Sequence, residues 1–301
     1  MSQIDVAPLE RGTSFPAELV NEFVNAVRGK SAVAKLSDQR PLAFNGNEYM
    51  VFNMPNEIDV VAENGKKSHG GVTVESKTIV PIKFEYGARV SDEFMYASEE
   101  KQMDILRAFS EGFARKVARG LDIASMHGLN PRTGEESQVI ADNCFDKQVD
   151  ATVTYDAETA DENLQDAITK VQGKEADVTG IALSPAMGSA LGSIKANGIP
   201  MYPEFRFGQT PDNFAGLGID VNGTVAVGEE DNAIVGDFAN GFRWGYARQI
   251  GVEVIQYGDP DNTGVDLKGS NQVYLRSEIY LGWAILNKDA FARVTTGEAS
   301  E

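Results

Sequence analysis

Few residues in this sequence have the types and the spacing that a catalytic or metal site requires. The chain has two histidines, His69 and His127, and one cysteine, Cys144. Zinc ligands usually occur in pairs at short, fixed separations, and no two of these three residues have a ligand or catalytic spacing. We therefore predict one exposed loop histidine and one helix-end histidine, with no catalytic residue, no metal and no cofactor. A single cysteine also excludes an intrachain disulfide and fits a reducing compartment.

Two acidic clusters are the remaining candidates for a site. Glu229, Glu230 and Asp231 would suit a general-acid pair or a cation site, which is the basis of one hypothesis, a carboxylate- or metal-dependent enzyme. Adjacent carboxylates on a polar turn are usually solvated, and we interpret them so. Residues 259–264, DPDNTG, resemble the start of a calcium loop. Ser270 stands where that loop needs a bidentate glutamate, so we predict a plain turn.

Nucleotide-binding signatures are incomplete. Residues 29–31, Gly-Lys-Ser, imitate the end of a phosphate-binding loop, but Val24 stands where that loop needs a glycine. Residues 216–221, GLGIDV, lack the last glycine of the dinucleotide fingerprint. We predict no nucleotide site.

Composition narrows the function classes further. The chain has 301 residues, 42% of them hydrophobic, and a formal net charge of −18. Enough apolar residues are present to bury a core in one large domain or two ordinary ones. A broad basic face for nucleic acid is excluded, because affinity for phosphate is mainly electrostatic. We expect neither a membrane span nor a secretory signal, because no apolar run is long enough for either.

A long amphipathic helix over residues 97–129 is the element on which the others depend. Ser98 is the predicted N-cap, and Gly128 is predicted to end the helix before Pro131. About 30 residues span roughly 45 Å, so this is either a scaffold for other elements or an ordinary core helix. One apolar stripe runs along it, formed by Met103, Leu106, Phe109, Phe113, Val117 and Leu121.

The basic residues of this helix point away from the stripe. They are Lys101, Arg107, Arg115, Lys116 and Arg119. Three interpretations are open: an exposed helix face, a subunit contact, or a local basic surface on an otherwise acidic protein.

A β-rich arm precedes the long helix. Strands are predicted at 49–54, 58–62, 72–80 and 82–90, with a polar, glycine-rich tip at 63–71. Such an arm has too few residues for a core of its own, so we expect it to pack on a neighbouring subunit. At the tip, Lys66 and Lys67 either pair with acids on another subunit or only solubilise the loop.

The remaining segments indicate an α+β protein. An N-terminal helix is predicted from Ser14 to Gly29. A second unit from about 155 to 259 opens with a capping box of Thr159 and Glu162 and continues with alternating strands and glycine turns. The chain then closes on a strongly β run within 272–293, which we expect to return to the long-helix unit.

The order of these segments resembles the major capsid protein family of tailed bacteriophages, with the Hong Kong 97-type shell fold. The similar segments are FPAELV at 15–20, AENG at 62–65, VSDEF at 90–94, LSPAM at 183–187, NGIPMY at 197–202, IVGDF at 234–238 and LRSEIYLGWA at 275–284. Each motif is degenerate, but their order over residues 14–295 is specific.

The resemblance implies a division of the α+β chain into the parts of the phage capsid fold. These are an N-terminal arm and helix (1–35), an extended-loop β-hairpin (36–90), a peripheral domain (91–150 and 262–301) with a spine helix (98–128), and an axial α+β domain (151–261). The apolar stripe of the spine helix should then face the returning strand at 273–286.

The function implied is that of a structural major capsid protein, which self-assembles as hexamers and pentamers into an icosahedral shell around packaged double-stranded DNA. Its expected location is the virion, after assembly in the bacterial host cytoplasm. Expected partners are other copies of the chain, a portal, a decoration protein and, because only about 14 residues precede the arm helix, a separate scaffolding protein. No membrane is involved. The alternative is an encapsulin-type nanocompartment shell. Subunit-contact candidates are Glu63, Lys66, Lys67, Arg107, Arg115 and Arg119.

Overall fold

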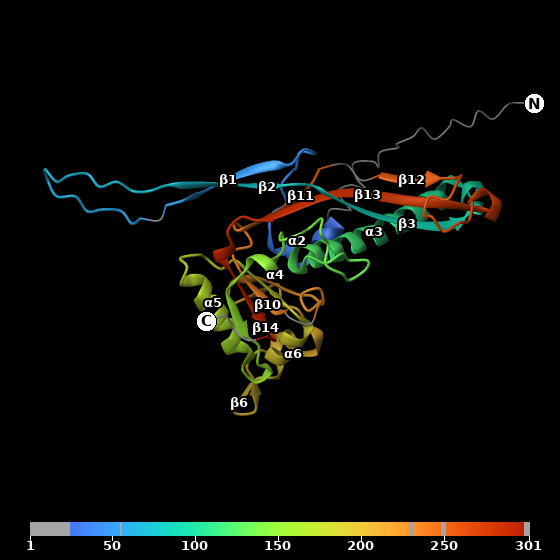
Figure 1. Cartoon of the computed structure of the whole chain (residues 1–301). Helices are drawn as coiled ribbons and strands as arrows, with labels where there is room; N and C mark the ends of the chain where they lie inside the picture. Colours follow the sequence, from blue (N-terminus) through green and yellow to red (C-terminus); the bar gives the residue numbers. More distant parts are fainter. Residues whose placement is uncertain (1–24, 55, 229–230, 248–250, 298–301) are drawn as a thin grey trace, which may run out of the picture.

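The computed structural model describes residues 25–54, 56–228, 231–247 and 251–297. It is a mixed α+β structure built from one long helix, a four-stranded sheet, a six-stranded sheet and an extended two-stranded ribbon (Figure 1). The predicted fold class is confirmed. Of the predicted N-terminal helix, residues 25–28 are helical, and its start at Ser14 lies outside the described residues.

The long helix is α3, Glu99–His127. Gly128 ends it in the left-handed conformation, with φ of 69°, which glycine adopts without steric cost. Ser98 occupies the N-cap position as predicted, but its side chain makes no capping hydrogen bond. The predicted capping box at Thr159 and Glu162 does not form, because the Thr159 side chain makes no capping hydrogen bond.

The four-stranded sheet lies along α3 (Figure 1). Its longest strand is β13, Gln272–Ile285, which pairs antiparallel with β3, Ile82–Ser91, on one side. On the other side it pairs with β11, Phe242–Tyr246, and β12, Gly251–Ile255. Buried and half-buried residues alternate along most of β13, because successive side chains of a strand point to opposite faces.

The apolar stripe of α3 packs against β13, as predicted. Phe113 and Leu121 share a core with Ile279 and Trp283. Leu106 and Phe109 pack in a smaller cluster with Phe94, Val273 and Leu275 at the other end of the strand. Met103 is 48% exposed, so the stripe continues about one turn beyond the residues that pack on it.

The hairpin is an extended ribbon that reaches away from the rest of the chain (Figure 1). Its strands are β1, Asn47–Asn53, and β2, Thr73–Ile79, which pair antiparallel. The predicted strand at 58–62 is wrong, because this exposed segment pairs with no described strand. The segment predicted as the last hairpin strand is β3, which instead pairs with β13.

The six-stranded sheet has the order β4, β14, β10, β5, β9, β8. These strands are β4 Thr152–Thr154, β5 Gly180–Leu183, β8 Asn213–Phe214, β9 Leu217–Val221, β10 Asp231–Gly236 and β14 Phe291–Thr295. On one face, α5, Ala160–Gln172, and α6, Pro185–Ser193, bury Leu164 and Met187 against the sheet.

The opposite face of this sheet meets the core of the long-helix unit. Ala182 and Ile234 share that core with Val33 of α2, Ala32–Leu36. Four phenylalanines close the junction: Phe145 has ring-centroid distances of 5.0 Å to Phe291, 5.5 Å to Phe242 and 6.0 Å to Phe238. Phe145 belongs to α4, Phe145–Gln148.

The predicted boundary at residue 261, between the axial and peripheral domains, assigns three strands to the wrong sheet. Strands β11 and β12 pair with β13 instead of joining the second unit, and β14 joins the six-stranded sheet instead of the peripheral unit. Strands adjacent along the chain usually neighbour each other in space. Here pairings between distant segments override that tendency.

The remaining elements are short. They are β6 Lys195–Ala196, β7 Ile199–Pro200, and the 3₁₀ turns η1 Asp92–Tyr96, η2 Ala157–Thr159, η3 Pro203–Gly208, η4 Lys268–Ser270 and η5 Lys288–Ala290. None of the described helices is long and apolar enough to cross a bilayer.

Candidate functional site

The predicted contact residues lie on two separate exposed surfaces. Glu63, Lys66 and Lys67 flank a turn at the hairpin tip, in which the Gly65 amide donates to the Ala62 carbonyl oxygen at 2.8 Å. Asn64 lies in the left-handed region at φ 70°, which asparagine tolerates better than most residues.

The basic residues of α3 form the second surface. Arg107, Arg115 and Arg119 are all exposed, and they lie on the side of the helix away from the stripe that packs on β13. The structure therefore does not bring the two sets of contact candidates together within one chain.

A contact surface that the sequence interpretation did not resolve lies on the ribbon itself. Met50, Phe52 and Val74 share one face, because Phe52 is opposite Val74 in the register and Met50 is two residues before Phe52. These side chains are 65%, 62% and 53% exposed. Contiguous exposed apolar residues usually mark an interaction surface. The period-2 alternation of Met50 and Phe52 was the available signal.

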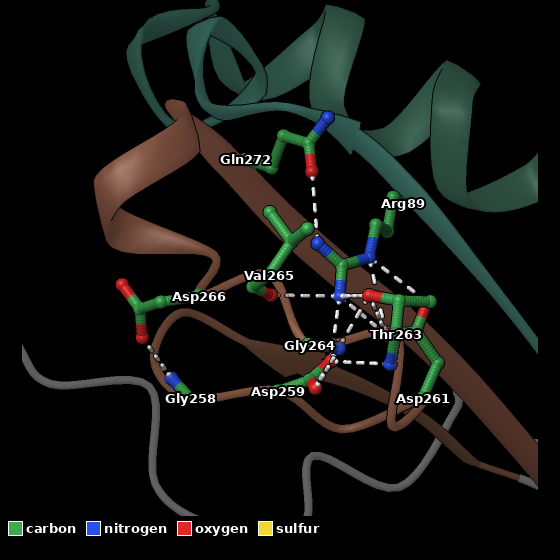
Figure 2. A network of polar contacts seen from close by, with 9 residues as sticks. All are labelled: Arg89, Gly258, Asp259, Asp261, Thr263, Gly264, Val265, Asp266 and Gln272. Carbon is green, nitrogen blue, oxygen red and sulfur yellow. Dashed lines mark hydrogen bonds and ion pairs between the residues drawn. The ribbon is translucent and has the colours of Figure 1, made fainter.

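The calcium-like segment proves to be an arginine-binding loop (Figure 2). Arg89 of β3 extends into the loop, and its Nη2 atom lies 2.8 Å from Asp259 Oδ1 and 2.9 Å from the Val265 carbonyl oxygen. Its Nε atom donates to Asp261 Oδ2 at 2.8 Å. The hydrogen bond from Arg89 lowers the pKa of Asp261 to about 2. The guanidinium thus occupies the position in which a calcium loop holds its cation.

Replacing Arg89 with leucine is expected to release this loop while leaving the rest of the sheet folded. The substitution removes the donor shared by Asp259 and Asp261, so the carboxylates repel each other. Hydrogen exchange over residues 258–266 should rise by about tenfold or more. The matched control is Arg276→Leu on β13, whose partner is Glu253. Unchanged exchange in the Arg89 variant would contradict the assignment.

The acidic cluster at 229–231 is not a solvated turn in the part that the structure describes. Glu229 and Glu230 lie outside the described residues, but Asp231 is buried in β10. Its carboxylate accepts from Arg293 Nε at 3.1 Å and from Nη2 at 2.9 Å. The interpretation of Asp231 as a solvated carboxylate is therefore wrong. Its partner Arg293 lies 62 residues later in the sequence.

His127 is also engaged by residues distant in the sequence. Its Nδ1 atom lies 2.9 Å from Asp146 Oδ2 and its Nε2 atom 2.9 Å from the Thr224 carbonyl oxygen. Arg293 Nη2 lies 2.9 Å from Asp146 Oδ1. Burial lowers the pKa of His127, but the hydrogen bond and charge of Asp146 outweigh that effect, and the pKa is raised.

This cluster has the spacing of a metal site without its chemistry. Ligand atoms of His127, Asp146 and Asp231 lie within 4.8 Å of one another. However, the Arg293 guanidinium, which stays protonated in proteins, already lies against both carboxylates. Both ring nitrogens of His127 also face acceptors. We interpret the cluster as an ion-pair network and not as a set of metal ligands.

Asp122 joins the N-terminal segment to α3. It accepts from Ser31 Oγ at 2.5 Å, from the Ala32 amide at 2.9 Å and from the Val33 amide at 3.2 Å. Thr224 Oγ1 also donates to it, at 2.8 Å. The carboxylate therefore satisfies orphan amides at the start of α2 from another helix. Burial raises the pKa of Asp122 to about 6.

Replacing Asp122 with alanine is expected to destabilise the chain by about 3 kcal/mol, because the substitution leaves buried donors without an acceptor. Denaturant unfolding of the purified chain measures this difference. Asp104→Ala, at an exposed position of the same helix, is the control and should change the free energy of unfolding by less than about 0.5 kcal/mol. Equal effects of the two variants would refute the role of Asp122.

Comparisons with known proteins identify the family to which this architecture belongs. The phage capsid family model matches residues 12–296, and the chain belongs to this family. A solved structure from Mycobacterium phage Ogopogo is 30% identical, with a TM-score of 0.76 over 88% of this chain and 92% of that one. One from Gordonia phage Cozz is 24% identical, with a TM-score of 0.72 over 88% and 86%.

More distant structures share the fold. The capsid of a native GTA particle is 12% identical, with a TM-score of 0.61 over 91% of each chain. No curated protein matches the sequence. The chain is thus a major capsid protein, a structural subunit of an icosahedral virion shell made of many copies.

Proposed function

We infer that the subunits form hexamers and pentamers in which each hairpin lies on a neighbouring subunit. The observation that supports this most strongly is the ribbon of β1 and β2. It has an exposed apolar face, and among its described residues only its base, at Ile79, joins a core cluster of the same chain. A two-stranded ribbon is marginal by itself in water, so a neighbour must cover it.

The spine helix and the hairpin tip supply the other proposed contacts. Arg107, Arg115 and Arg119 face outward from α3 and offer a row of positive charge. Other subunits of a chain with net charge −18 are a suitable acidic partner for them. Glu63, Lys66 and Lys67 take the same role at the hairpin tip.

The shell is proposed to enclose packaged double-stranded DNA. A strongly acidic protein binds phosphate weakly, so DNA slides along such a wall during packaging. A portal, a separate scaffolding protein and a decoration protein complete the proposed assembly, which takes place in the host cytoplasm. A division into arm, extended loop, peripheral and axial domains belongs to the same proposal, with β11 and β12 assigned to the peripheral domain and β14 to the axial domain.

Expression of the chain alone, followed by negative-stain electron microscopy, tests the assembly. Closed shells or plates of hexamers are expected, and a compact monomer that never assembles would count against the proposal. The contents of native particles test the proposed packaging of DNA. Nucleic acid inside them supports it, and a protein cargo in place of nucleic acid, as in a nanocompartment, would contradict it.

Deleting residues 64–71 is expected to impair shell assembly while the subunit still folds, because the deletion shortens the reach of the ribbon without touching either core. Circular dichroism checks the fold and electron microscopy the shells. The double variant Lys66→Ser, Lys67→Ser removes the two charges but keeps the length of the ribbon, so it distinguishes the effect of charge from that of length. Normal shells from the deletion would show that the tip is dispensable.

A further inference from the structure

A continuous chain of buried and half-buried polar contacts crosses the junction between the two sheets. Asp122 of α3 accepts from Thr224 Oγ1, and the Thr224 carbonyl oxygen lies 2.9 Å from His127 Nε2. His127 Nδ1 then meets Asp146 of α4, and Asp146 meets Arg293 of β14. Arg293 ends the chain of contacts on Asp231 of β10. We call these six residues the junction network.

The geometry determines the protonation state of His127. Its two ring nitrogens face a carboxylate oxygen and a carbonyl oxygen, and neither of these atoms can donate a proton in its ionised or ordinary form. Both nitrogens must therefore carry hydrogen for both contacts to be hydrogen bonds. A neutral imidazole would lose one contact and set a lone pair against an oxygen.

The two sides of the network belong to different parts of the fold. His127 and Asp122 lie at the end of the helix that packs on the four-stranded sheet. Asp231 and Arg293 lie on neighbouring strands of the six-stranded sheet. Loss of the histidine proton therefore weakens contacts that hold one part against the other.

We propose that the junction network is a pH-sensitive joint between α3 and the six-stranded sheet, closed when His127 is doubly protonated and loosened when it loses one proton. No role in shell contacts is assigned to these buried residues, so the joint is independent of the proposed assembly.

Two other ionisable groups of the joint, Asp231 and Asp122, also stabilise it less as the pH rises above about 4. Burial raises the pKa of Asp231 to about 7 and that of Asp122 to about 6. A raised folded-state pKa, as in His127 and these two acids, contributes stability that is lost as the pH rises through it. Cys144, buried beside α4, also has a pKa raised by burial.

Asp146 sets the acid limit of the joint. Burial raises its pKa, but the hydrogen bond from His127 and the charge of Arg293 outweigh this effect and lower it. Its contribution is therefore present above its ordinary pKa and lost as the pH falls through the lowered value. The joint should be tightest at mildly acidic pH and loosen toward alkaline pH.

Hydrogen exchange of the full chain, measured by mass spectrometry on shells and on unassembled subunits, tests the proposal. Protection factors corrected for the intrinsic rate are compared at about pH 6 and about pH 8.5, below and above the ordinary pKa of histidine. Peptides covering 222–227 and 291–295 should lose about tenfold or more protection at the higher pH. Equal protection at both pH values would overturn the proposal.

Two variants identify the titrating group. His127→Gln, which does not titrate, should reduce the pH step to the part that Asp231 contributes, whereas His69→Gln at the exposed hairpin position should retain the full step. If His127→Gln does not fold, Asp146→Asn serves instead: it removes the charge that raises the pKa of His127, so the step should move to lower pH. A step that persists unchanged in His127→Gln, or at the same pH in Asp146→Asn, would refute the joint.

Discussion

Shells are expected to be lost when the apolar face of the ribbon is made polar by Phe52→Ser together with Val74→Ser. The two side chains are opposite each other in the register and more than half exposed in the isolated subunit. Their burial against a neighbour would contribute about 3 to 5 kcal/mol per contact, and the contact recurs in every subunit. Sedimentation and electron microscopy should show unassembled protein in place of shells.

The matched control is Glu75→Ser, on the opposite face of the same strand. Glu75 is opposite Val51, and its side chain alternates with that of Val74, so the variant should assemble normally. Both variants should keep the circular dichroism spectrum of the parent, because neither position belongs to a described core cluster. Shells from the double variant would refute the role of this face.

Replacing Arg293 with methionine is expected to destabilise the subunit by about 3 to 5 kcal/mol, the usual cost of removing one partner of a buried ion pair. Asp231 would remain buried without its guanidinium partner, and Asp146 would lose one of its two cationic contacts. Chemical or thermal unfolding of unassembled subunits measures the loss.

A second substitution separates charge from packing. Adding Asp231→Leu to Arg293→Met removes the uncompensated carboxylate, so part of the lost stability should return. Arg276→Met, which breaks a more exposed ion pair with Glu253, should cost less than about 1 kcal/mol. If Arg293→Met costs no more than Arg276→Met, the buried pair does not stabilise the junction.

Local patterns predicted the elements of the fold with good accuracy. The helix from Ser98 to Gly128 was readable because its 3.6-residue stripe and glycine end are set by neighbouring residues. The returning strand was readable from its β-branched and aromatic residues. The order of segments along the chain was also sufficient to indicate the capsid family.

The sequence indicated exposed residues only where exposure follows from local pattern. The basic residues of α3 were predicted to point away from the apolar stripe, and Arg107, Arg115 and Arg119 are exposed. Their contact with other subunits stays a prediction. Asp231 was misinterpreted because its acidic neighbours suggested a solvated turn. Its burial depends on Arg293, and local sequence does not reveal a partner so far along the chain.

The sequence by itself determined that this protein has a long scaffold helix and a reaching β arm, since helix period and strand alternation are properties of short segments. Only the tertiary structure decided which strands share a sheet, which cation fills the acidic loop at 259–265, and that Asp122, His127 and Arg293 belong to one buried network. The physical reason is that a buried charge needs a partner in space, and the chain can supply that partner from any position that its fold brings near.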